Sequence, residues 1–496
     1  RSTLFPYTTL FRSTALIHNL TSTMKFQPTP ALWLGIFLLI FTAAVPMQAQ
    51  LNGLIKKAEQ AADKIAQPAA KSSAPASSPA TNSAPAATQA RDYYISADGK
   101  GREGTKEAPA KDIAAIAALV QAGDRIHIAA GIYTSRMDQS SDVFQVPVSI
   151  IGGYSPDFSK RDPWGQFQTV LSGSNDISKA LTTERIGILT DKSFRDWNGE
   201  ILIDGIIVDN GARNYYRDPA TQEFIVRKAS PEKGMNPTPD TPGIKVRAGN
   251  ATRIIIRNCV VTNVAANQGA IDVQVGKDGS ALIENNLIVN NTGEGIMCKS
   301  NYHGDTGLPK YVVRNNTILF NWKRDAIASF GGNSIMFDNT LIMRAENNVF
   351  GFGDYGGVNN VKQCKGIVLK NNLFVGHRQY DYQEFATGLP LGEMDDYANL
   401  LSTESGGNYS QTIDLKLPAA WAEKYFHRKE VSRTEVDAAA KVSNSGANQL
   451  RAMFGLPLQA GAVGMDAEIW LHRLPLADAL QLGQTKYGKG AGCSRP

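Results

Sequence analysis

The stretch IENNLIVNN, residues 283–291, combines the composition of a strand with that of a turn. Isoleucine, leucine and valine suit a half-buried strand, whereas paired asparagines favour turns, because asparagine tolerates the left-handed backbone conformation. The stretch therefore predicts short strands joined by an asparagine-containing turn. Stacked copies of such a turn could also bond through their amides.

Four other stretches align with this one: IIIRNCVV, YVVRNNTILF, RAENNVFGF and GIVLKNNLFV. Each copy has an asparagine at the same place, and these residues are Asn258, Asn285, Asn315, Asn347 and Asn371. The steps between them are 27, 30, 32 and 24 residues. A fixed motif at an irregular period of this length predicts a solenoid whose coils differ in loop length.

A second strand-like stretch recurs in the same cycle, as GIKVR (243–247), AIDVQ (270–274), GIMCK (295–299) and AIASF (326–330). Strand alternation places Ile244, Ile271, Ile296 and Ile327 on the inner face. Each coil thus supplies at least two strands that stack into parallel sheets. The outward columns are then Lys245, Asp272, Met297, Ala328 and Arg247, Gln274, Lys299, Phe330.

The residue before each asparagine alternates in charge from copy to copy. In order along the chain these residues are Asp204, Arg257, Glu284, Arg314, Glu346 and Lys370. In-register stacking would put opposite charges on neighbouring coils, worth a few tenths of a kcal/mol per exposed pair. This column is interpreted as scaffold.

The pattern from about Tyr93 to Val375 resembles a right-handed parallel β-helix of the pectate-lyase-like kind. Residues 93–133 resemble the opening of bacterial β-helix proteins, in which a helix caps the open end, and residues 150–173 resemble early-coil sequence. The apolar stripe of the expected cap is Ile113, Ile116, Ala117 and Val120. The fold class expected is all-β, with this helical cap and a partly helical C-terminal region.

The step of 53 residues from Gly205 to Asn258 is interpreted as about two coils. It contains a polar, proline-bearing stretch, residues 211–242, which predicts a large loop. Beyond the repeats, residues 414–431 and 445–456 are expected to be helices that cap the exposed strand edges.

The expected organisation has five parts. Residues 1–23 resemble translated adapter sequence, and Met24 is taken as the start of a signal peptide at 24–49. Residues 50–90 are a short helix and an Ala/Pro/Ser-rich linker, 91–400 are the β-helix, and 401–496 are a cap or appended region. The apolar run of the leader is shorter than the about 20 residues of a membrane span, so a secreted, periplasmic or cell-surface protein without a stable span is expected.

Charge and cysteine content narrow the function classes. The net charge is +5 without a dense basic run, so nucleic acid is not an expected partner. Cys259, Cys298, Cys364 and Cys493 have no zinc-like spacing, and buried single thiols are the preferred interpretation. The oligomeric state is left open.

An outward column with two cations, an amide and an aromatic suits an acidic polysaccharide or cell-surface glycan. The stretch NNTGEGIMCKS, residues 290–300, resembles elements of the alginate and dermatan sulfate lyase family. The resemblance implies that Lys299 is the base and Glu294 a Ca²⁺ ligand. Separately from the resemblance, Asp272 is a candidate metal ligand and Arg247 a candidate catalytic residue. The sequence departs from that family at Gly295 and Ile296, and Phe330 stands where an arginine is expected. Expected substrate-binding residues are Lys245, Gln274, His303, Lys323, Arg324 and Phe330.

Two alternatives remain. A glycoside hydrolase needs paired carboxylates, which Asp272, Glu294, Asp305 and Asp325 could supply in neighbouring coils, although no adjacent-aspartate motif lies within the clear repeats. A non-catalytic solenoid would use the same outward columns for glycan binding or adhesion.

Overall fold

The computed structural model describes residues 90–135, 141–172, 184–209, 242–322, 332–353, 355–362, 364, 366–377, 379–384, 387–388, 394, 401–411, 476–477, 479–480 and 491–496. The chain divides into residues 1–86 and 87–496, and the described residues all belong to the second unit. The expected leader, linker and C-terminal helices lie outside the described residues, as do nearly all of the polar loop and Lys323, Arg324, Asp325 and Phe330. In the described ranges, no helix has the length and apolar character needed to cross a bilayer.

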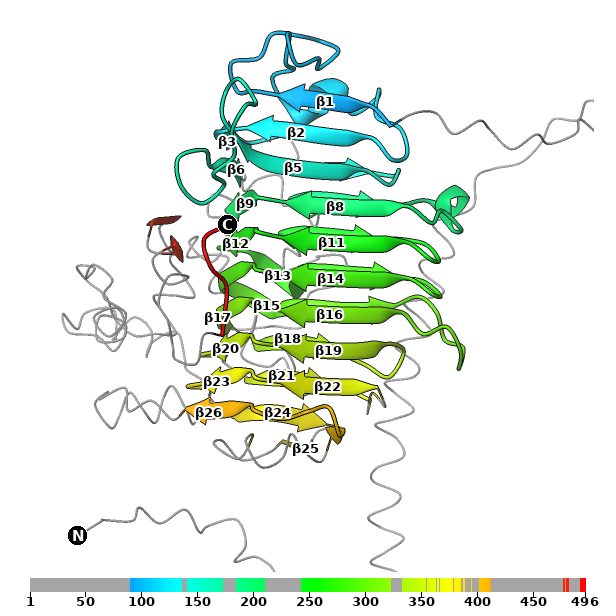
Figure 1. The fold of residues 1–496 in the computed structure, drawn as a ribbon, viewed down its shortest axis with the longest axis vertical. Helices are drawn as coiled ribbons and strands as arrows, with labels where there is room; N and C mark the ends of the chain where they lie inside the picture. Colours follow the sequence, from blue (N-terminus) through cyan, green and yellow to red (C-terminus); the bar gives the residue numbers. More distant parts are fainter. Residues whose placement is uncertain are drawn as a thin grey trace, which may run out of the picture. The chain divides into compact units, whose positions relative to one another are not determined.

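Nine strands pair in parallel to form the first sheet (Figure 1). They are β1 (Asp92–Ile95), β2 (Arg125–Ala129), β5 (Ser149–Tyr154), β8 (Glu200–Asp204), β11 (Arg253–Arg257), β14 (Ser280–Glu284), β16 (Lys310–Arg314), β19 (Ile342–Glu346) and β22 (Ile367–Lys370). Neighbours in this order belong to successive coils, so the sheet runs the length of the stack.

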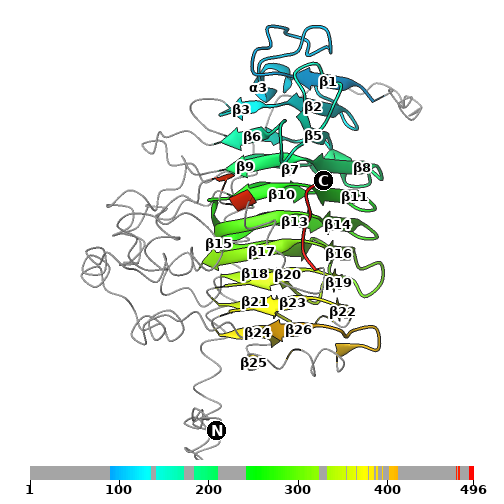
Figure 2. The same ribbon diagram turned by 60° about the vertical axis from the view of Figure 1, so that its left-hand side comes forward.

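The second sheet contains two rows of strands (Figure 2). One row is β3 (Gly131–Tyr133), β6 (Thr169–Ser172), β9 (Ile206–Asp209), β12 (Val260–Thr262), β15 (Leu287–Ser300), β17 (Thr317–Trp322), β20 (Val349–Gly351), β23 (Leu373–Val375) and β26 (Tyr409–Gln411). The other is β4 (Asp142–Phe144), β7 (Ile186–Leu189), β10 (Ile244–Arg247), β13 (Ala265–Val275), the second half of β15, β18 (Asn333–Phe337), β21 (Gly356–Asn360) and β24 (Tyr380–Glu384). Among the strands of the described residues, the two-residue β25 (Thr387–Gly388) is the one that pairs antiparallel with another strand, β24. This arrangement is the predicted right-handed parallel β-helix.

The predicted register of the asparagine turn is confirmed. Asn258, Asn285, Asn315, Asn347 and Asn371 all have φ between 52° and 55°, the left-handed conformation that the motif requires. Asn285 Nδ2 donates to Asn258 Oδ1 at 2.8 Å. The alternating charge column is also in register, with Arg257 beside both Asp204 and Glu284, and Arg314 Nη2 lies 2.7 Å from Glu284 Oε2.

The residues after four of these asparagines, together with Asn408, form a buried ladder that the sequence analysis did not single out. Its members are Asn286, Asn316, Asn348, Asn372 and Asn408. Asn286 Nδ2, for example, donates to Asn316 Oδ1 at 2.9 Å and to Ile256 O at 3.0 Å. Because each amide also accepts from a backbone N–H of the neighbouring coil, as Asn316 Oδ1 does from Asn286 N at 3.0 Å, its polar atoms are paired without water.

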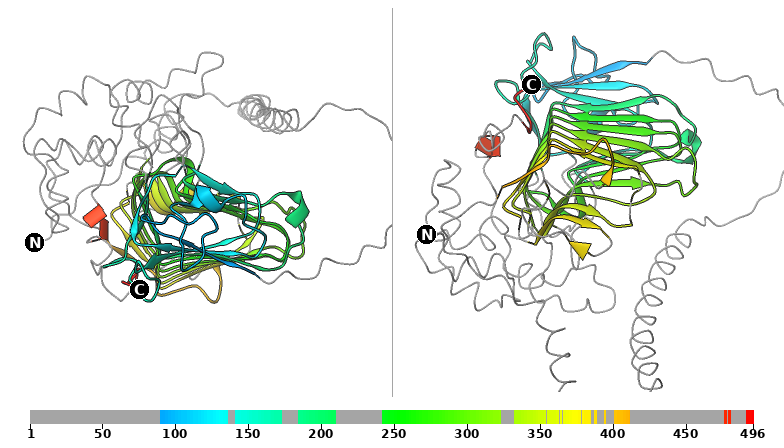
Figure 3. Two further views of the ribbon diagram at one scale, coloured as in Figure 1. Left: turned by 90° about the horizontal axis from the view of Figure 1, so that it is seen from above. Right: turned by 60° about the horizontal axis from the view of Figure 1, so that its bottom comes forward.

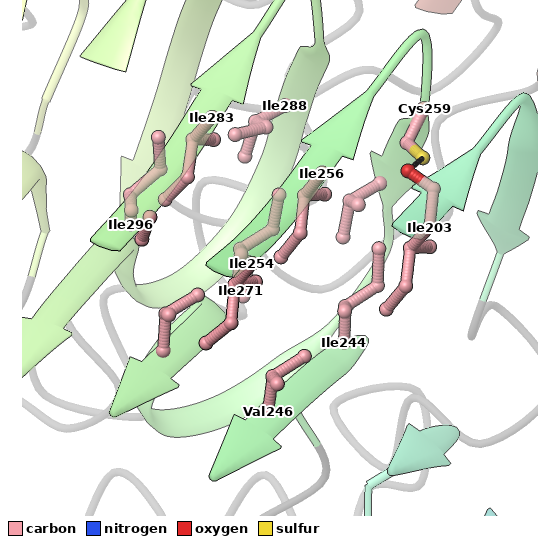
Figure 4. Packing of buried hydrophobic residues seen from close by; sticks show 14 of the residues in the cluster. Ile203, Ile244, Val246, Ile254, Ile256, Cys259, Ile271, Ile283, Ile288 and Ile296 are labelled. Carbon is pink, nitrogen blue, oxygen red and sulfur yellow. Dashed lines mark hydrogen bonds between the residues drawn. The ribbon is translucent and has the colours of Figure 1, made fainter. Parts of the chain in front are cut away.

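Aliphatic side chains fill the interior between the sheets (Figure 4). Viewed along the stack, the described strands surround this common interior (Figure 3, left). Ile244, Ile271 and Ile296 stack in register, each with none of its surface exposed. Cys259, Cys298 and Cys364 are free and buried, as predicted, and Cys259 Sγ lies 3.8 Å from Ile203 O.

The structure corrects two expectations about coil boundaries. The strand that follows GIMCK is β18, not residues 326–330, so Met336 rather than Ala328 lies beside Met297. Both segments satisfy the same alternation, and a longer loop moved the strand along the chain. The step from Gly205 to Asn258 is one coil with an insertion between β9 and β10, because β8 pairs directly with β11.

The ends of the stack also differ from expectation. The cap helix α3 is a single turn, Ile113–Ile116, with Asp112 as its N-cap, although Ile113, Ile116 and Val120 do pack into the core. At the other end, β26 extends the parallel pairing past the expected boundary at residue 400.

Residues 491–496 lie across the asparagine turns of several coils, which Figure 1 shows as the red segment beside β12 and β17. Gly492 N donates to Asn347 O at 2.8 Å, and Cys493 N donates to Thr317 Oγ1 at 3.0 Å. Ser494 N donates to Asn285 Oδ1 at 2.8 Å, while Arg495 Nη2 lies 2.7 Å from Asp162 Oδ2. This segment, the C-terminal clasp, therefore crosses the coils along the stack.

Candidate functional site

The predicted outward columns form on the face of β10, β13 and β15 (Figure 2). Lys245, Asp272 and Met297 align across the three strands, and so do Arg247, Gln274 and Lys299. Parallel strands lie about 4.8 Å apart, so each column presents its side chains at that spacing. Three coils therefore bring six of the predicted side chains onto one face.

Charges of alternating sign follow one another along the first column, from Glu184 to Lys245 to Asp272. The Glu184 carboxylate can reach the column because Gly187 has no side chain there. Gly187 occupies the column position beside Lys245, and a Cβ there would lie 2.8 Å from Glu184 Oε1. The Glu184 carboxylate thus covers the space that a side chain would fill, and its Oε2 lies 4.0 Å from Lys245 Nζ. Asp272 follows on the next coil, so a cation lies between two buried carboxylates.

Lys299 links the two columns through a charged contact. Its Nζ lies 3.1 Å from Asp272 Oδ1, and it also donates to Gln268 Oε1. The Lys299 side chain is 29% exposed, whereas that of Asp272 is 4% exposed. The ammonium is therefore held at the surface over a buried carboxylate, which would be left uncompensated without it.

Arg247 presents an exposed guanidinium beside Gln274. Its Nε donates to Gln274 Oε1 at 3.1 Å, and the residue is exposed. Within the described residues, no carboxylate forms an ion pair with it. Its guanidinium can thus accept a carboxylate from a ligand without first breaking an ion pair.

Glu294 belongs to a different, buried group. Its Oε2 accepts from Asn333 N at 2.8 Å, and Asn333 Oδ1 accepts from Tyr380 Oη at 2.8 Å. The ring of Tyr380 passes over Gly356, where a Cβ would lie 2.3 Å from it. Burial, with the nearby charge of Glu294, raises the pKa of Tyr380 far above its ordinary value, so this phenol remains a hydrogen-bond donor.

The expected calcium ligands are not brought together. Glu294 aligns with Gly269, whereas Asp272 aligns with Met297, and each carboxylate already has a protein partner. Among the described residues, no three His, Cys, Asp or Glu side chains gather closely enough to hold a metal ion. The pairing of β13 and β15 therefore does not bring these two carboxylates together as ligands of one Ca²⁺ ion.

The other predicted residues lie around this face or outside the described part. His303 and Asp305 are exposed in the loop after β15, where the Tyr302 ring centroid lies 5.9 Å from Lys277 Nζ. Phe330 was expected in the column position after Lys299, where the resembled family has an arginine. This expectation is wrong, because the strand that pairs with β15 on the next coil is β18.

The sequence analysis missed Glu184 and Gln268. Glu184 lies just before a strand, and the useful signal was Gly187, because a strand glycine can mark the close approach of another group. Gln268 lies where the pairing of β13 and β15 shifts between Ala265 and Gly269. Simple alternation does not place a residue at such an irregularity.

No protein-family model matches the chain, and no curated protein matches it. The solved structures with a detectable likeness include pectate lyase Pel9A, with 14% identity and a TM-score of 0.29 over 76% of this chain and 89% of that one. A rhamnogalacturonan lyase matches with 11% identity and a TM-score of 0.23, over 59% and 80% of the two chains. A GH136 lacto-N-biosidase from Eubacterium ramulus matches with 11% identity and a TM-score of 0.22, over 60% and 66%. The strand pairing itself defines the parallel β-helix.

Proposed function

We propose that the face of β10, β13 and β15 binds an acidic polysaccharide, and that the chain cleaves it by β-elimination with Lys299 as the base. The alignment of Arg247, Gln274 and Lys299 across three coils is the observation that supports this most directly. A guanidinium and an ammonium can hold carboxylates, and the amide between them can bond to sugar hydroxyls.

The proposed reaction needs both cations. Arg247 would pair with the uronate carboxylate, which makes the neighbouring C–H proton easier to remove. Lys299 Nζ, once deprotonated, would take that proton; the C–H electrons form a double bond, the glycosidic C–O bond breaks, and the leaving oxygen gains a proton from water. The ion pair with Asp272 would have to open for Lys299 to act in this way.

That ion pair favours a second candidate function, glycan binding without catalysis. Lys299 Nζ donates to Asp272 and Gln268, so in this arrangement it acts as a hydrogen-bond donor. A carboxylate of the polymer could add to these contacts without any proton transfer. The same face would then serve adhesion or retention of the glycan.

One paired assay separates the two functions. The protein is incubated with alginate, pectate and glycosaminoglycans while ultraviolet absorbance monitors unsaturated ends, and binding is measured on the same polymers. Absorbance that rises and is abolished by Lys299→Ala supports the lyase. Binding without product that is weakened by Arg247→Ala supports the binding protein.

The matched control is Lys310→Ala, which removes an exposed lysine from β16 in the other sheet. It should leave both readouts unchanged. If no polymer is cleaved or bound, or if the control weakens binding as much as Arg247→Ala, the proposed function is wrong.

We also propose that the protein acts outside the cytoplasm, because the expected leader at 24–49 would direct export. Amino-terminal sequencing of protein recovered from the cell envelope or medium tests this. A mature terminus after residue 49 is expected, and an intact leader on cytoplasmic protein would contradict export.

A further inference from the structure

A glycine bulge turns Tyr154 toward the outer face of the first sheet. His127 pairs with Ile151, but Ala129 pairs with Tyr154, so β5 has one extra residue between these pairs. The extra residue lies at Gly152 and Gly153, and the latter has φ of 83°. Without the bulge, alternation would place Tyr154 on the inner face; with it, the phenol lies on the same face as His127.

Tyr154, His127 and Asp92 form a continuous hydrogen-bonded chain. His127 Nε2 lies 2.9 Å from Asp92 Oδ1, and His127 Nδ1 lies 3.0 Å from Tyr154 Oη. Hydrogen bonds from Arg125 and His127 outweigh the effect of burial and hold the pKa of Asp92 below its ordinary value, so this carboxylate is only an acceptor at neutral pH. Nε2 must therefore carry the imidazole proton, which leaves the Nδ1 lone pair to accept from the Tyr154 hydroxyl.

Neighbouring side chains fix this chain in place. Arg125 donates to both oxygens of Asp92, at 2.7 and 2.9 Å. The ring of Tyr94 stacks on His127 with centroids 5.0 Å apart, and Phe158 packs against Tyr94 at the same distance. Because the imidazole plane and the carboxylate are both held, the relay is organised before any ligand arrives.

At rest, Tyr154 is the hydrogen-bond donor and His127 the acceptor, and both pKa shifts oppose full transfer of the phenolic proton before an acyl group is attacked. Burial lowers the pKa of His127, so the imidazole is a neutral acceptor at neutral pH, and burial raises the pKa of Tyr154, so the phenol holds its proton. The Arg161 guanidinium lies 5.2 Å from the Tyr154 ring centroid and would stabilise negative charge that develops on its oxygen. His127 is 14% exposed and Tyr154 is partly exposed, so solvent can reach the pair.

We propose that Asp92, His127 and Tyr154 form a second reactive site, in which the relay activates the Tyr154 hydroxyl to accept an acyl group from an ester. The order of acid, imidazole and hydroxyl is the arrangement that activates nucleophilic hydroxyl groups in hydrolases on unrelated folds. None of these residues lies on the face proposed to bind polysaccharide.

The proposed reaction uses the side chains of Asp92, His127 and Tyr154 together with solvent water. Tyr154 Oη bonds to the acyl carbon while its proton passes to His127 Nδ1, and the imidazolium is stabilised by Asp92. The ester C–O bond then breaks, and the leaving oxygen takes the proton from His127 Nδ1. Water, activated by the same nitrogen, releases the acid and restores the hydroxyl. The substrate class is a small exposed acyl ester; its identification as an O-acyl sugar rests on the proposed function, whereas the reactivity of Tyr154 does not.

The probe that tests the site is p-nitrophenyl acetate, applied to the full chain. We expect rapid release of p-nitrophenolate and acetylation of Tyr154, located by mass spectrometry of peptides. Tyr154→Phe keeps the ring and should abolish the label at this position, and His127→Gln or Asp92→Asn should slow labelling about a hundredfold, the usual range for loss of a general base.

Two controls separate this site from general reactivity and from the glycan site. Tyr94→Phe removes the adjacent phenol that is outside the relay and should label normally at Tyr154, as should Lys299→Ala, whatever the outcome with polysaccharides. Equal circular dichroism and melting temperature in each variant will show that folding is intact. Labelling of Tyr154 no faster than that of other tyrosines, or undiminished in a folded His127→Gln variant, overturns the proposal.

Discussion

Two of the turns in each coil use asparagine in different ways: the turn between the first sheet and the second, and the turn between the two rows of the second sheet. In the turn after the first sheet, Asn286, Asn316 and Asn348 follow one another through the same hydrogen bonds on each coil. In the next turn Asn291 begins the same pattern, accepting from Val264 N at 2.9 Å. Among the described residues, however, the aligned Asn321 amide has no hydrogen-bond partner.

The residue type at this second turn then changes from coil to coil. Gly353 follows Asn321 and has no side chain to contribute, and on the next coil His377 Nδ1 accepts from Gly353 N at 3.1 Å. One turn is therefore a uniform scaffold, whereas the other contains a histidine and buried polar atoms that have no hydrogen-bond partner among the described residues. The comparison teaches that regular pairing of backbone strands does not require regular chemistry at every corner.

The largest expected effect comes from breaking the uniform ladder. Asn316→Ala removes four hydrogen bonds, to Asn286, Asn348 and Ile283 O, and leaves the buried Asn286 N without its acceptor, although Asn286 Nδ2 keeps its bond to Ile256 O. We expect the free energy of unfolding to fall by about 4 kcal/mol or more, since the unpaired N–H costs roughly 1–3 kcal/mol and the other hydrogen bonds are lost with it. Chemical denaturation monitored by circular dichroism measures this. The matched control is Asn321→Ala, which should cost about 1 kcal/mol or less, and equal losses at the two sites would contradict the comparison.

The next effect depends on pH. Burial lowers the pKa of His377 from 6.5 to about 3, so between these values the unfolded chain binds a proton that the folded chain does not. Stability should therefore fall as pH decreases from 6.5 toward 3, by about 1.4 kcal/mol per pH unit. Denaturation at pH 7 and at pH 4.5 measures the slope. His377→Asn should reduce it while keeping an acceptor for Gly353 N, and an unchanged slope would mean that His377 does not titrate with folding.

The smallest effect concerns the left-handed residues on the uniform turn. Asn315 has φ of 53°, which alanine adopts only with strain, so Asn315→Ala should cost about 1 kcal/mol. Asn315→Gly should cost less, because glycine adopts this conformation freely. Thermal melting of the two variants gives the order. A glycine variant less stable than the alanine variant would contradict the assignment of this cost to the left-handed backbone conformation.

Most of the fold could be predicted because two local signals agreed. The spacing of the asparagines set the coils, and alternation within strands set which side chains face inward, so Lys245, Asp272 and Lys299 were placed correctly in their columns. The prediction that residues 326–330 form the strand after GIMCK was wrong because AIASF and NSIMF alternate equally well. Strand periodicity cannot choose between two such segments when loop length varies.

The sites were less predictable because they depend on departures from regular strands. Glu184 reaches Lys245 over the missing side chain of Gly187, and Tyr154 reaches His127 because two glycines form a bulge. Consecutive glycines within IIGGY were a usable signal, since glycine inside a strand often marks a bulge. The ion pair of Lys299 with Asp272 needed the three-dimensional register, because 27 residues separate the two.

The C-terminal clasp changes how the coils depend on one another. In a simple solenoid each coil contacts only its neighbours, so the array can fray from its ends one coil at a time. The clasp joins residues 209 apart at Ser494 and Asn285, and 176 apart at Cys493 and Thr317. Since one short segment holds turns of several coils, opening any of them disturbs the same segment. The coils held by the clasp should therefore open together, and their backbone amides should exchange hydrogen at correlated rates.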